Sequence, residues 1–260
     1  MHKRRFVFII LAVVAVTAIL ASVLSVASKT EADGAVTDAD YPVLAAHRGG
    51  AGVWPQNTMV AFDNALKADP DLALELDVQA LKDGTLVVMH DPKVDSLSAN
   101  GMTGNVKDMT PAQWKALRIK SPTGGQAAPA ATLDDVLNEY GNTDTMLVVE
   151  LKDAAAADKF VEKLWPHHEQ VLIQSFDTAI VSRMVRTGFS TLQLASNSSI
   201  TLVDGIHSVG IQTLNITPAL VTKAHDKGVK VWAWGNEVTR TQFENHDRGL
   251  DGYMVNDPTK

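Results

Sequence analysis

Residues 72–90, LALELDVQALKDGTLVVMH, contain two short apolar runs that are typical of adjacent β-strands. Only residues 79–84 separate the runs, whereas a parallel crossover needs about a dozen residues or more. The runs therefore form a hairpin that turns on Asp83-Gly84. Glu75 and Asp77 are two positions apart and project from one face of the first strand, where His90 can join them from the return strand.

From residue 41 onward, short apolar runs alternate with helical stretches, which is the pattern of βα units. We expect strands at 43–47, 73–78, 146–151, 171–175, 191–195, 213–216, 229–234 and 252–255. We expect helices at 58–68, 133–140, 155–165, 179–187, 200–209, 219–227 and 239–246. Eight such strands predict an α/β fold of the TIM (β/α)8 barrel type. The hairpin strand is an extra element, and an insertion at 91–131 follows it as a cap or loop over the barrel.

The N-terminus carries an apolar run at residues 6–28, preceded by Lys3-Arg4-Arg5. Its length suits a membrane span, which needs roughly 20 residues, and the basic flank places the N-terminus in the cytoplasm. We therefore expect residues 1–28 to be a transmembrane anchor, or a signal segment if the chain is cleaved after Ser25-Val26-Ala27. An acidic stalk at 29–40 and the barrel domain at 41–260 would follow. The expected localisation is the cell membrane with the domain extracellular, or secretion after cleavage.

The overall charge and the absence of cysteine exclude several classes of function. The formal net charge is −7, so no basic face is implied and we expect no nucleic acid partner. The chain has no cysteine, which excludes disulfides, zinc thiolates and a thiol nucleophile. A phosphate ester substrate would therefore need local positive charge or a metal ion.

Three carboxylates lie in or at the end of apolar strands. Glu75 and Asp77 would be buried, and a buried carboxylate costs several kcal/mol unless it is paired or bound to a metal. An ion pair with Arg48 is one explanation; a site for Mg²⁺ or Ca²⁺ is the other, because these ions prefer oxygen ligands. Glu150 and Lys152 share one side of a third strand, where they form either an exposed ion pair or a third ligand beside a cation for phosphate.

Two histidines stand at strand ends near these carboxylates. His47 and Arg48 close the first expected strand, where barrel enzymes place their active-site groups. Cleavage of a phosphodiester needs one group to remove a proton and another to supply one, and His47 and His90 suit both tasks. Trp234, at the end of its strand, is a candidate wall for a small organic group, whereas Trp232 is expected in the core.

These motifs resemble the glycerophosphodiester phosphodiesterase family, a group of phospholipase C-like phosphodiesterase barrels, over nearly the whole of residues 41–260. The resemblance rests on an ordered series of short matches: His47-Arg48-Gly49, Asn57-Thr58, Glu75-Leu76-Asp77-Val78, Asp83-Gly84, His90-Asp91, Val149-Glu150-Leu151-Lys152, Gln174-Ser175-Phe176 and Gly249-Leu250-Asp251-Gly252. It implies hydrolysis of a glycerophosphodiester to an alcohol and glycerol 3-phosphate, with the glycerol 2-hydroxyl as internal nucleophile and a cyclic phosphate as intermediate.

The resemblance also implies a role for each candidate residue. His47 and His90 act as acid and base, and Arg48 completes the catalytic set by stabilising the phosphate. Lys152 also stabilises the phosphate and, with Trp234, binds the substrate. A divalent metal, Ca²⁺ or Mg²⁺, is held by the three carboxylates: Glu75, Asp77 and Glu150.

The chain departs from the family pattern at three places. Gln56 replaces the glutamate of a Pro-Glu-Asn-Thr motif, and we expect altered affinity or specificity from this change. Residues 234–237, WGNE, replace Trp-Thr-Val-Asn, and residues 256–258, NDP, replace a Thr-Asp pattern, so the substrate wall is expected to differ. No closing helix follows residues 252–255, which leaves the segment before Tyr41 as a candidate to seal the barrel.

Three other functions compete with hydrolysis of soluble diesters. Export favours a cell-surface glycerophosphate polymer such as teichoic acid as substrate. A phospholipase of the same barrel class would need an apolar rim, for which residues 91–131 offer only Met102 and Met109. Gln56 motivates a degenerate, non-catalytic binding domain, but the retention of both histidines and all three carboxylates favours an enzyme.

Overall fold

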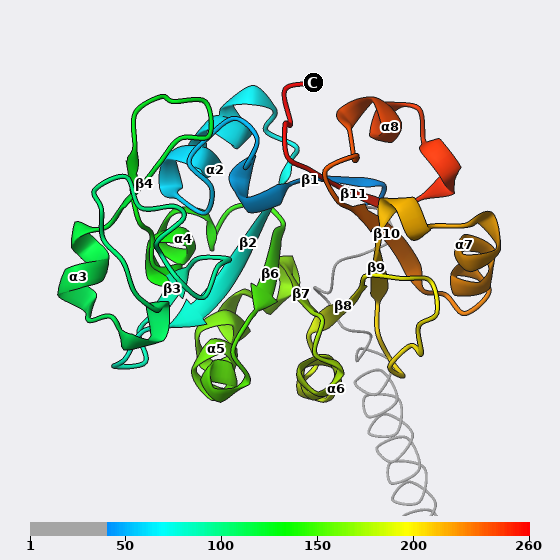
Figure 1. Ribbon diagram of the computed structural model, residues 1–260. Coiled ribbons are helices and arrows are strands. Elements are labelled where there is room, and N and C mark those ends of the chain that lie inside the picture. Colours follow the sequence, from blue (N-terminus) through cyan, green and yellow to red (C-terminus); the bar gives the residue numbers. More distant parts are fainter. Residues whose placement is uncertain (1–40) are drawn as a thin grey trace, which may run out of the picture. The chain divides into compact units, whose positions relative to one another are not determined.

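The computed structural model describes residues 41–260, and in this part of the chain eight parallel strands close into a barrel (Figure 1). β1 pairs with both β11 and β2, which completes the ring and confirms the predicted TIM barrel. In chain order the strands are β1 Val43–Ala46, β2 Ala73–Ala80, β6 Leu147–Leu151, β7 Val171–Ser175, β8 Ser190–Ala195, β9 Ser208–Gln212, β10 Lys230–Trp234 and β11 Gly252–Val255.

Helices pack around the barrel, and the larger apolar cluster includes side chains from both layers. The α-helices of this layer are α2 Met59–Ala68, α4 Leu133–Tyr140, α5 Ala157–Leu164, α6 Thr178–Thr187, α7 Pro218–His225 and α8 Arg240–Glu244. Short 3-10 helices lie at His47–Gly49, Ala154–Ala156, Trp165–Gln170, Thr213–Asn215 and Asp247–Gly249. The side chains of Thr58, Thr132, Asp177 and Thr217 cap the N-termini of α2, α4, α6 and α7.

The interior of the barrel is filled by a second, smaller apolar cluster that includes Trp232. Trp232 is fully buried, as predicted, and a Cβ atom added at Gly252 would lie 2.0 Å from its ring. Tyr41 packs edge-on against Trp232, with 6.1 Å between ring centroids. The segment before Tyr41, which we expected to seal the barrel, lies outside the described residues.

One predicted helix and one predicted strand are wrong. Residues 200–207 form no helix, and β9 occupies Ser208–Gln212 instead of 213–216. In β9 the apolar residues alternate, and Val209 and Ile211 join the larger core. Gly210 lies between them, where a Cβ atom would approach Leu192 and Leu194 to 2.8 Å, so the strand passes through a point that admits no side chain.

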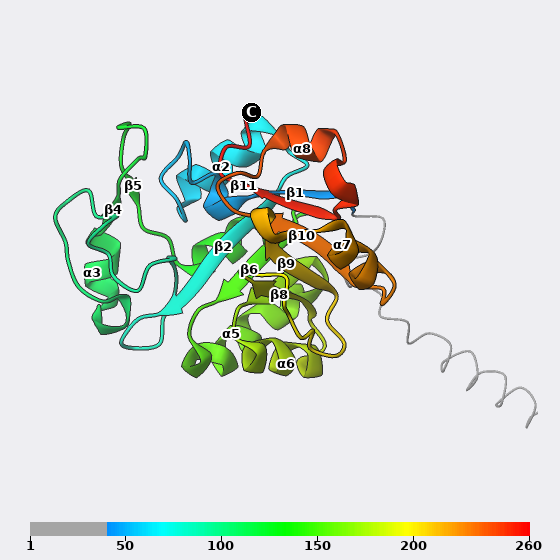
Figure 2. The ribbon, with the colours of Figure 1, turned by 45° about the vertical axis from the view of Figure 1, so that its right-hand side comes forward.

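The predicted hairpin and insertion lie on the outer side of β2 (Figure 2). β3, Leu86–Val88, pairs antiparallel with β2, and Gly84 in the connection has φ 81°. The insertion contains a 3-10 helix Val106–Asp108, α3 Pro111–Ala116, β4 Arg118–Ile119 and β5 Ala128–Pro129. These elements enclose their own core around Trp114, which buries Met109 and holds Met102 against it. The two methionines therefore do not form the apolar rim that a phospholipase would need.

The predicted localisation is not supported. Among residues 41–260, no helix is both long and apolar enough to cross a membrane. The apolar run at 6–28 and the stalk at 29–40 lie outside the described residues. The prediction of a membrane-anchored or secreted protein with an extracellular domain is therefore wrong on this finding, and no anchor is shown.

The contact between β11 and Trp232 generates a test of the packing. We expect Gly252→Ala to lower the free energy of unfolding by about 3 kcal/mol, because overpacked cores lose roughly this much. Denaturant unfolding measures the change. Gly125→Ala is the control, since a Cβ atom there meets nothing closer than 3.4 Å. Equal unfolding midpoints for the two variants would contradict the interior packing described above.

Candidate active site

Three acidic side chains meet at the carboxyl ends of β2 and β6. The parallel register places Asp77 opposite Glu150, and Glu75 lies two residues earlier on the same face of β2. One oxygen from each of the three carboxylates lies within 4.8 Å of the others, and all three side chains are buried. Oxygen ligands at this separation suit a hard divalent cation. The triad that the sequence predicted is therefore assembled in the fold.

Two cations lie against the triad. Lys152 Nζ is 3.1 Å from Asp77 Oδ1 and 2.9 Å from Glu150 Oε1, and Arg48 Nε is 3.4 Å from Asp77 Oδ2. Burial by itself raises the pKa of Asp77, but Lys152 and Arg48 outweigh it and hold that pKa below its ordinary value. Ion pairing and a metal-binding arrangement, which the sequence left as alternatives, are thus present together.

The other two carboxylates favour their protonated forms. Burial, reinforced by the charge of Asp77, raises the pKa of Glu75 well above its ordinary value. The same two causes raise the pKa of Glu150 to about 7, against the opposing effect of Lys152. A bound divalent ion would displace these protons and compensate the charge of the ionised carboxylates. The residues present therefore fit a metal ion.

Hydrogen bonds fix the orientation of the triad. Glu75 Oε1 accepts from Gln174 Nε2 at 2.6 Å, and Glu75 Oε2 accepts from the backbone N–H of Arg48 at 2.7 Å. Asp77 Oδ2 accepts from Asn57 Nδ2 at 2.9 Å, while the Asp77 N–H donates to Asn57 Oδ1 at 3.2 Å. Arg48 and Asn57 have φ values of 53° and 56°, a strained conformation for residues other than glycine that is common at functional sites.

Asn57 and Gln174 belong to motifs that resemble the family, but the sequence assigned neither residue a role in the site. Gln174 is the register partner of Glu150 on β7, so alternation along three neighbouring strands could have identified it. The contact of Asn57 with Asp77 depends on the loop after β1. Gln174 Oε1 is buried and has no hydrogen-bond partner in the described part of the chain, so an acceptor remains available beside the triad.

The two histidines have different partners. His47 Nδ1 lies 2.6 Å from Asn256 Oδ1, and its Nε2 lies 4.0 Å from Glu75 Oε2. His90 Nδ1 lies 2.7 Å from Asp91 Oδ1. An acceptor oxygen beside each Nδ1 favours the tautomer with the proton on that nitrogen, which would leave Nε2 for other contacts. Burial and the charge of Arg48 lower the pKa of His47 to about 4, and burial also lowers that of His90.

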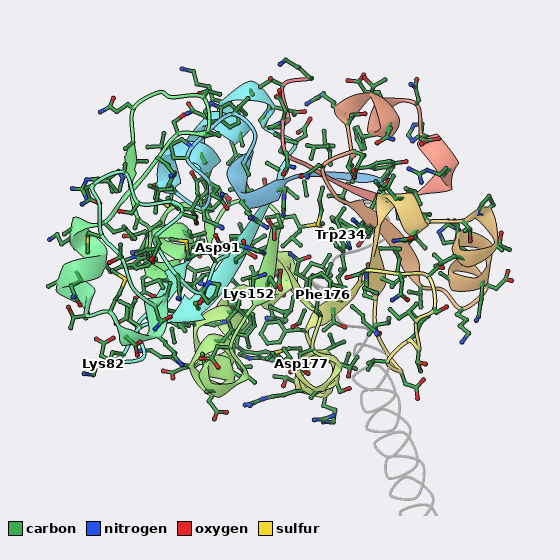
Figure 3. The ribbon with its side chains drawn as sticks, viewed as in Figure 1. Lys82, Asp91, Lys152, Phe176, Asp177 and Trp234 are labelled. Atoms are coloured by element: carbon green, nitrogen blue, oxygen red, sulfur yellow. The ribbon has the colours of Figure 1, made fainter. Side chains whose placement is uncertain are left out.

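A cavity of about 390 Å³ unites most of the predicted site residues. Its wall includes an aromatic pair, Phe176 and Trp234, whose rings meet edge to face at 5.6 Å. Trp234 Nε1 donates to the Gly210 carbonyl at 3.2 Å, which fixes the indole. Figure 3 shows both aromatic side chains, with Lys152, around the middle of the strand ring. The predicted residues that line this cavity are His47, Arg48, Glu75, His90, Glu150 and Trp234.

Gln56 contacts the site through Arg48. Arg48 Nη1 donates to Gln56 Oε1 at 2.9 Å. A glutamate at this position would pair its charge with the guanidinium, whereas the amide keeps a hydrogen bond without that charge. Gln56 is therefore a partner of Arg48 and does not belong to the carboxylate triad.

Fold and site together define the class of this protein. The cavity opens at the carboxyl ends of barrel strands, where enzymes of this fold carry their active sites. Phosphoric diester hydrolases can use a divalent ion held by carboxylates together with two imidazoles, and this cavity contains both a fitting carboxylate triad and two imidazoles.

Comparison with known proteins identifies the family. Residues 47–260 match the Glycerophosphoryl diester phosphodiesterase family, and the chain belongs to it. The prediction of an enzyme is thus confirmed, and the alternative of a non-catalytic binding domain is not supported.

Relatives span nearly the whole domain. A glycerophosphodiester phosphodiesterase of Caldanaerobacter subterraneus subsp. tengcongensis is 31% identical, over 83% of this chain and 94% of the relative. One from Bacillus subtilis is 32% identical, over 75% of this chain and 72% of the relative. The fold is similar to that of an Oleispira antarctica phosphodiesterase solved with the product sn-glycerol-3-phosphate, with TM-score 0.73, 22% identity and coverage of 85% and 95% of the two chains.

The raised pKa values of the triad predict that metal binding releases protons. With the pKa of Glu150 at about 7, this side chain is mostly protonated at pH 6 and ionised at pH 9. Adding Ca²⁺ or Mg²⁺ to metal-free protein should therefore release more protons at pH 6 than at pH 9. Calorimetric titration in two buffers of different ionisation enthalpy measures the number released. Glu139→Gln, an exposed substitution on α4, is the control and should behave as wild type. Proton release independent of pH would argue against the raised pKa of Glu150.

Proposed function

We propose that this protein hydrolyses glycerophosphodiesters to an alcohol and glycerol 3-phosphate, using a divalent metal and two histidines. The observation that carries the proposal is the meeting, at one cavity, of a carboxylate triad within 4.8 Å and the two imidazoles. Family membership supports the substrate class, and the sn-glycerol-3-phosphate bound to the Oleispira antarctica phosphodiesterase supports the product.

In the proposal, Glu75, Asp77 and Glu150 hold Ca²⁺ or Mg²⁺. When bound, the ion would neutralise charge on the phosphate and polarise its oxygens. Lys152 and Arg48 lie against the same triad, at 2.9–3.1 Å and 3.4 Å from carboxylate oxygens, so they are placed to contact the phosphate as well. Their positive charges stabilise the negative charge that develops on the phosphate oxygens in the transition state.

His47 and His90 transfer the protons of the reaction. One removes a proton from the attacking oxygen, which in this proposal is the glycerol 2-hydroxyl, and the other donates a proton to the leaving alkoxide. A neighbouring hydroxyl gains from proximity, and the resulting cyclic phosphate is opened by water to glycerol 3-phosphate. The Nδ1 contacts to Asn256 and Asp91 support Nε2 as the atom that exchanges the proton on each ring.

Trp234 and Phe176 would form the wall for the organic part of the substrate. Their edge-to-face contact and the hydrogen bond of Trp234 to Gly210 keep this wall in place. A soluble diester is favoured over an intact lipid, because Met102 and Met109 pack into the insertion. A cell-surface polymer could be the substrate only if the domain were exported, and export is not shown.

Metal dependence can be tested by the release of glycerol 3-phosphate from glycerophosphocholine. We expect turnover that EDTA abolishes and that added Ca²⁺ or Mg²⁺ restores, because the proposal places the metal ion on the three carboxylates next to the phosphate. A panel of other glycerophosphodiesters identifies the alcohol that the enzyme prefers. Absence of metal-sensitive turnover on every member of the panel would overturn the proposed function.

The histidine assignment is tested by substitution. His47→Ala and His90→Ala should each lower kcat by about 100-fold or more, since positioned acid–base groups contribute this much. Circular dichroism should show an intact fold in both variants. His246→Asn changes an exposed histidine outside the cavity and should retain wild-type activity. Near wild-type kcat in either of the first two variants contradicts the role assigned to that histidine.

A further inference from the structure

The ends of three neighbouring strands bring two asparagines next to His47. β1, β11 and β10 are adjacent in the sheet, and Ala46 at the end of β1 is the register partner of Val255 at the end of β11. His47 and Asn256 are the next residues on these two strands, so they emerge side by side. Asn236 follows β10 and reaches the same place.

Hydrogen bonds join these residues into a chain. Asn256 Nδ2 donates to Asn236 Oδ1 at 3.0 Å, and Asn256 Oδ1 lies 2.6 Å from His47 Nδ1. A carboxamide has one donor end and one acceptor end. With its donor end engaged by Asn236, Asn256 presents an acceptor to the imidazole. The ring then carries its proton on Nδ1, and Nε2 is left with a free lone pair.

The backbone holds Asn256 in this position. The Asn256 carbonyl accepts from the Gly52 N–H at 2.8 Å, and a Cβ atom on Gly52 would lie 2.9 Å from that carbonyl oxygen. The loop after His47 is therefore fastened to the same residue that contacts the imidazole. His47, Asn236 and Asn256 also line a hollow of about 320 Å³ together with Arg48.

We propose that Asn256 and Asn236 are positioning residues that hold His47 as its Nδ1–H tautomer, with the unprotonated Nε2 directed to the substrate. The inference rests on the proposed role of His47 in proton transfer. Both asparagines fall in the segments 234–237 and 256–258, where the chain departs from the family pattern. The two departures thus act together, because each supplies one partner of the same hydrogen bond.

The tautomer can be observed directly by ¹⁵N NMR of the full-length protein labelled at histidine. The signals of His47 are assigned by their loss in His47→Gln. We expect a protonated Nδ1 and an unprotonated Nε2 in wild type, and a shift toward the Nε2–H tautomer in Asn256→Ala. A wild-type spectrum with the proton on Nε2 overturns the proposal. This measurement needs no turnover. An enzyme inactive on all glycerophosphodiesters would therefore contradict the proposed function, while the NMR spectrum would still decide the tautomer.

Steady-state kinetics separates positioning from a merely structural role. Asn256→Ala should lower kcat about tenfold with little change in KM, since the loss of one oriented hydrogen bond has roughly this effect. Asn236→Ala should lower kcat less, and Asn236→Asp should restore it because the acceptor is kept. Asn215→Ala is the matched control, because Asn215 ends the 3-10 helix after β9 and donates to the Ser196 carbonyl. Wild-type kcat in Asn256→Ala contradicts the proposal, as does a loss in Asn236→Ala that Asn236→Asp fails to restore.

A double substitution tests whether the two asparagines act through one chain. If Asn236 acts only through Asn256, adding Asn236→Ala to Asn256→Ala should cause no further loss of kcat. If the kcat losses of the two single variants multiply in the double variant, the two asparagines act independently, and the proposed chain is contradicted. Thermal unfolding of each variant identifies any defect in folding, and the wild-type tautomer decides the proposal even if Asn256→Ala does not fold.

Discussion

The burial of three carboxylates around one point is the constraint on which the rest of the site depends. Charges this close in a poorly solvated cavity repel one another strongly, and each also loses its hydration. Lys152 and Arg48 offset part of this cost, and hydrogen bonds from Asn57 and Gln174 offset more. The part of the free-energy cost of ionising the three carboxylates that these contacts leave uncompensated favours binding of a divalent cation. The same charges that destabilise the metal-free protein are therefore the ones that would give the metal its affinity.

The barrel separates this costly cluster from the part of the core that stabilises the fold. Trp232 fills the interior next to Gly252 and Tyr41, and Trp234, two residues further along β10, already lines the cavity. A rigid, apolar interior below the strand ends limits the movement of the residues above it. The left-handed conformations of Arg48 and Asn57 persist on this support, because Glu75 and Asp77 hold both residues by hydrogen bonds.

The sequence predicted the parts of the site that depend on local pattern. Alternation along one strand placed Glu75 with Asp77, and the short connection at Gly84 required the hairpin that ends at His90. Gln174 and Asn256 lie in quoted motifs but received no role, because their contacts join residues that are far apart in the sequence. At 200–209 apolar spacing alone suggested a helix, but residues 200–207 are loop and turn and β9 begins at Ser208. The predicted localisation rested on residues 6–28, which lie outside the described residues.

The two histidines are not equivalent, and the difference lies in what stands behind each ring. One carboxylate oxygen of Asp91 faces His90, and the other accepts from Ser96. His47 instead faces the neutral amide of Asn256. A carboxylate stabilises an imidazolium by direct charge interaction, and an amide does so only through its dipole. His47 also lies beside Arg48, whose charge opposes protonation. Two imidazoles that share one cavity are thus placed in unlike electrostatic surroundings, which is the condition under which one can give a proton while the other takes one.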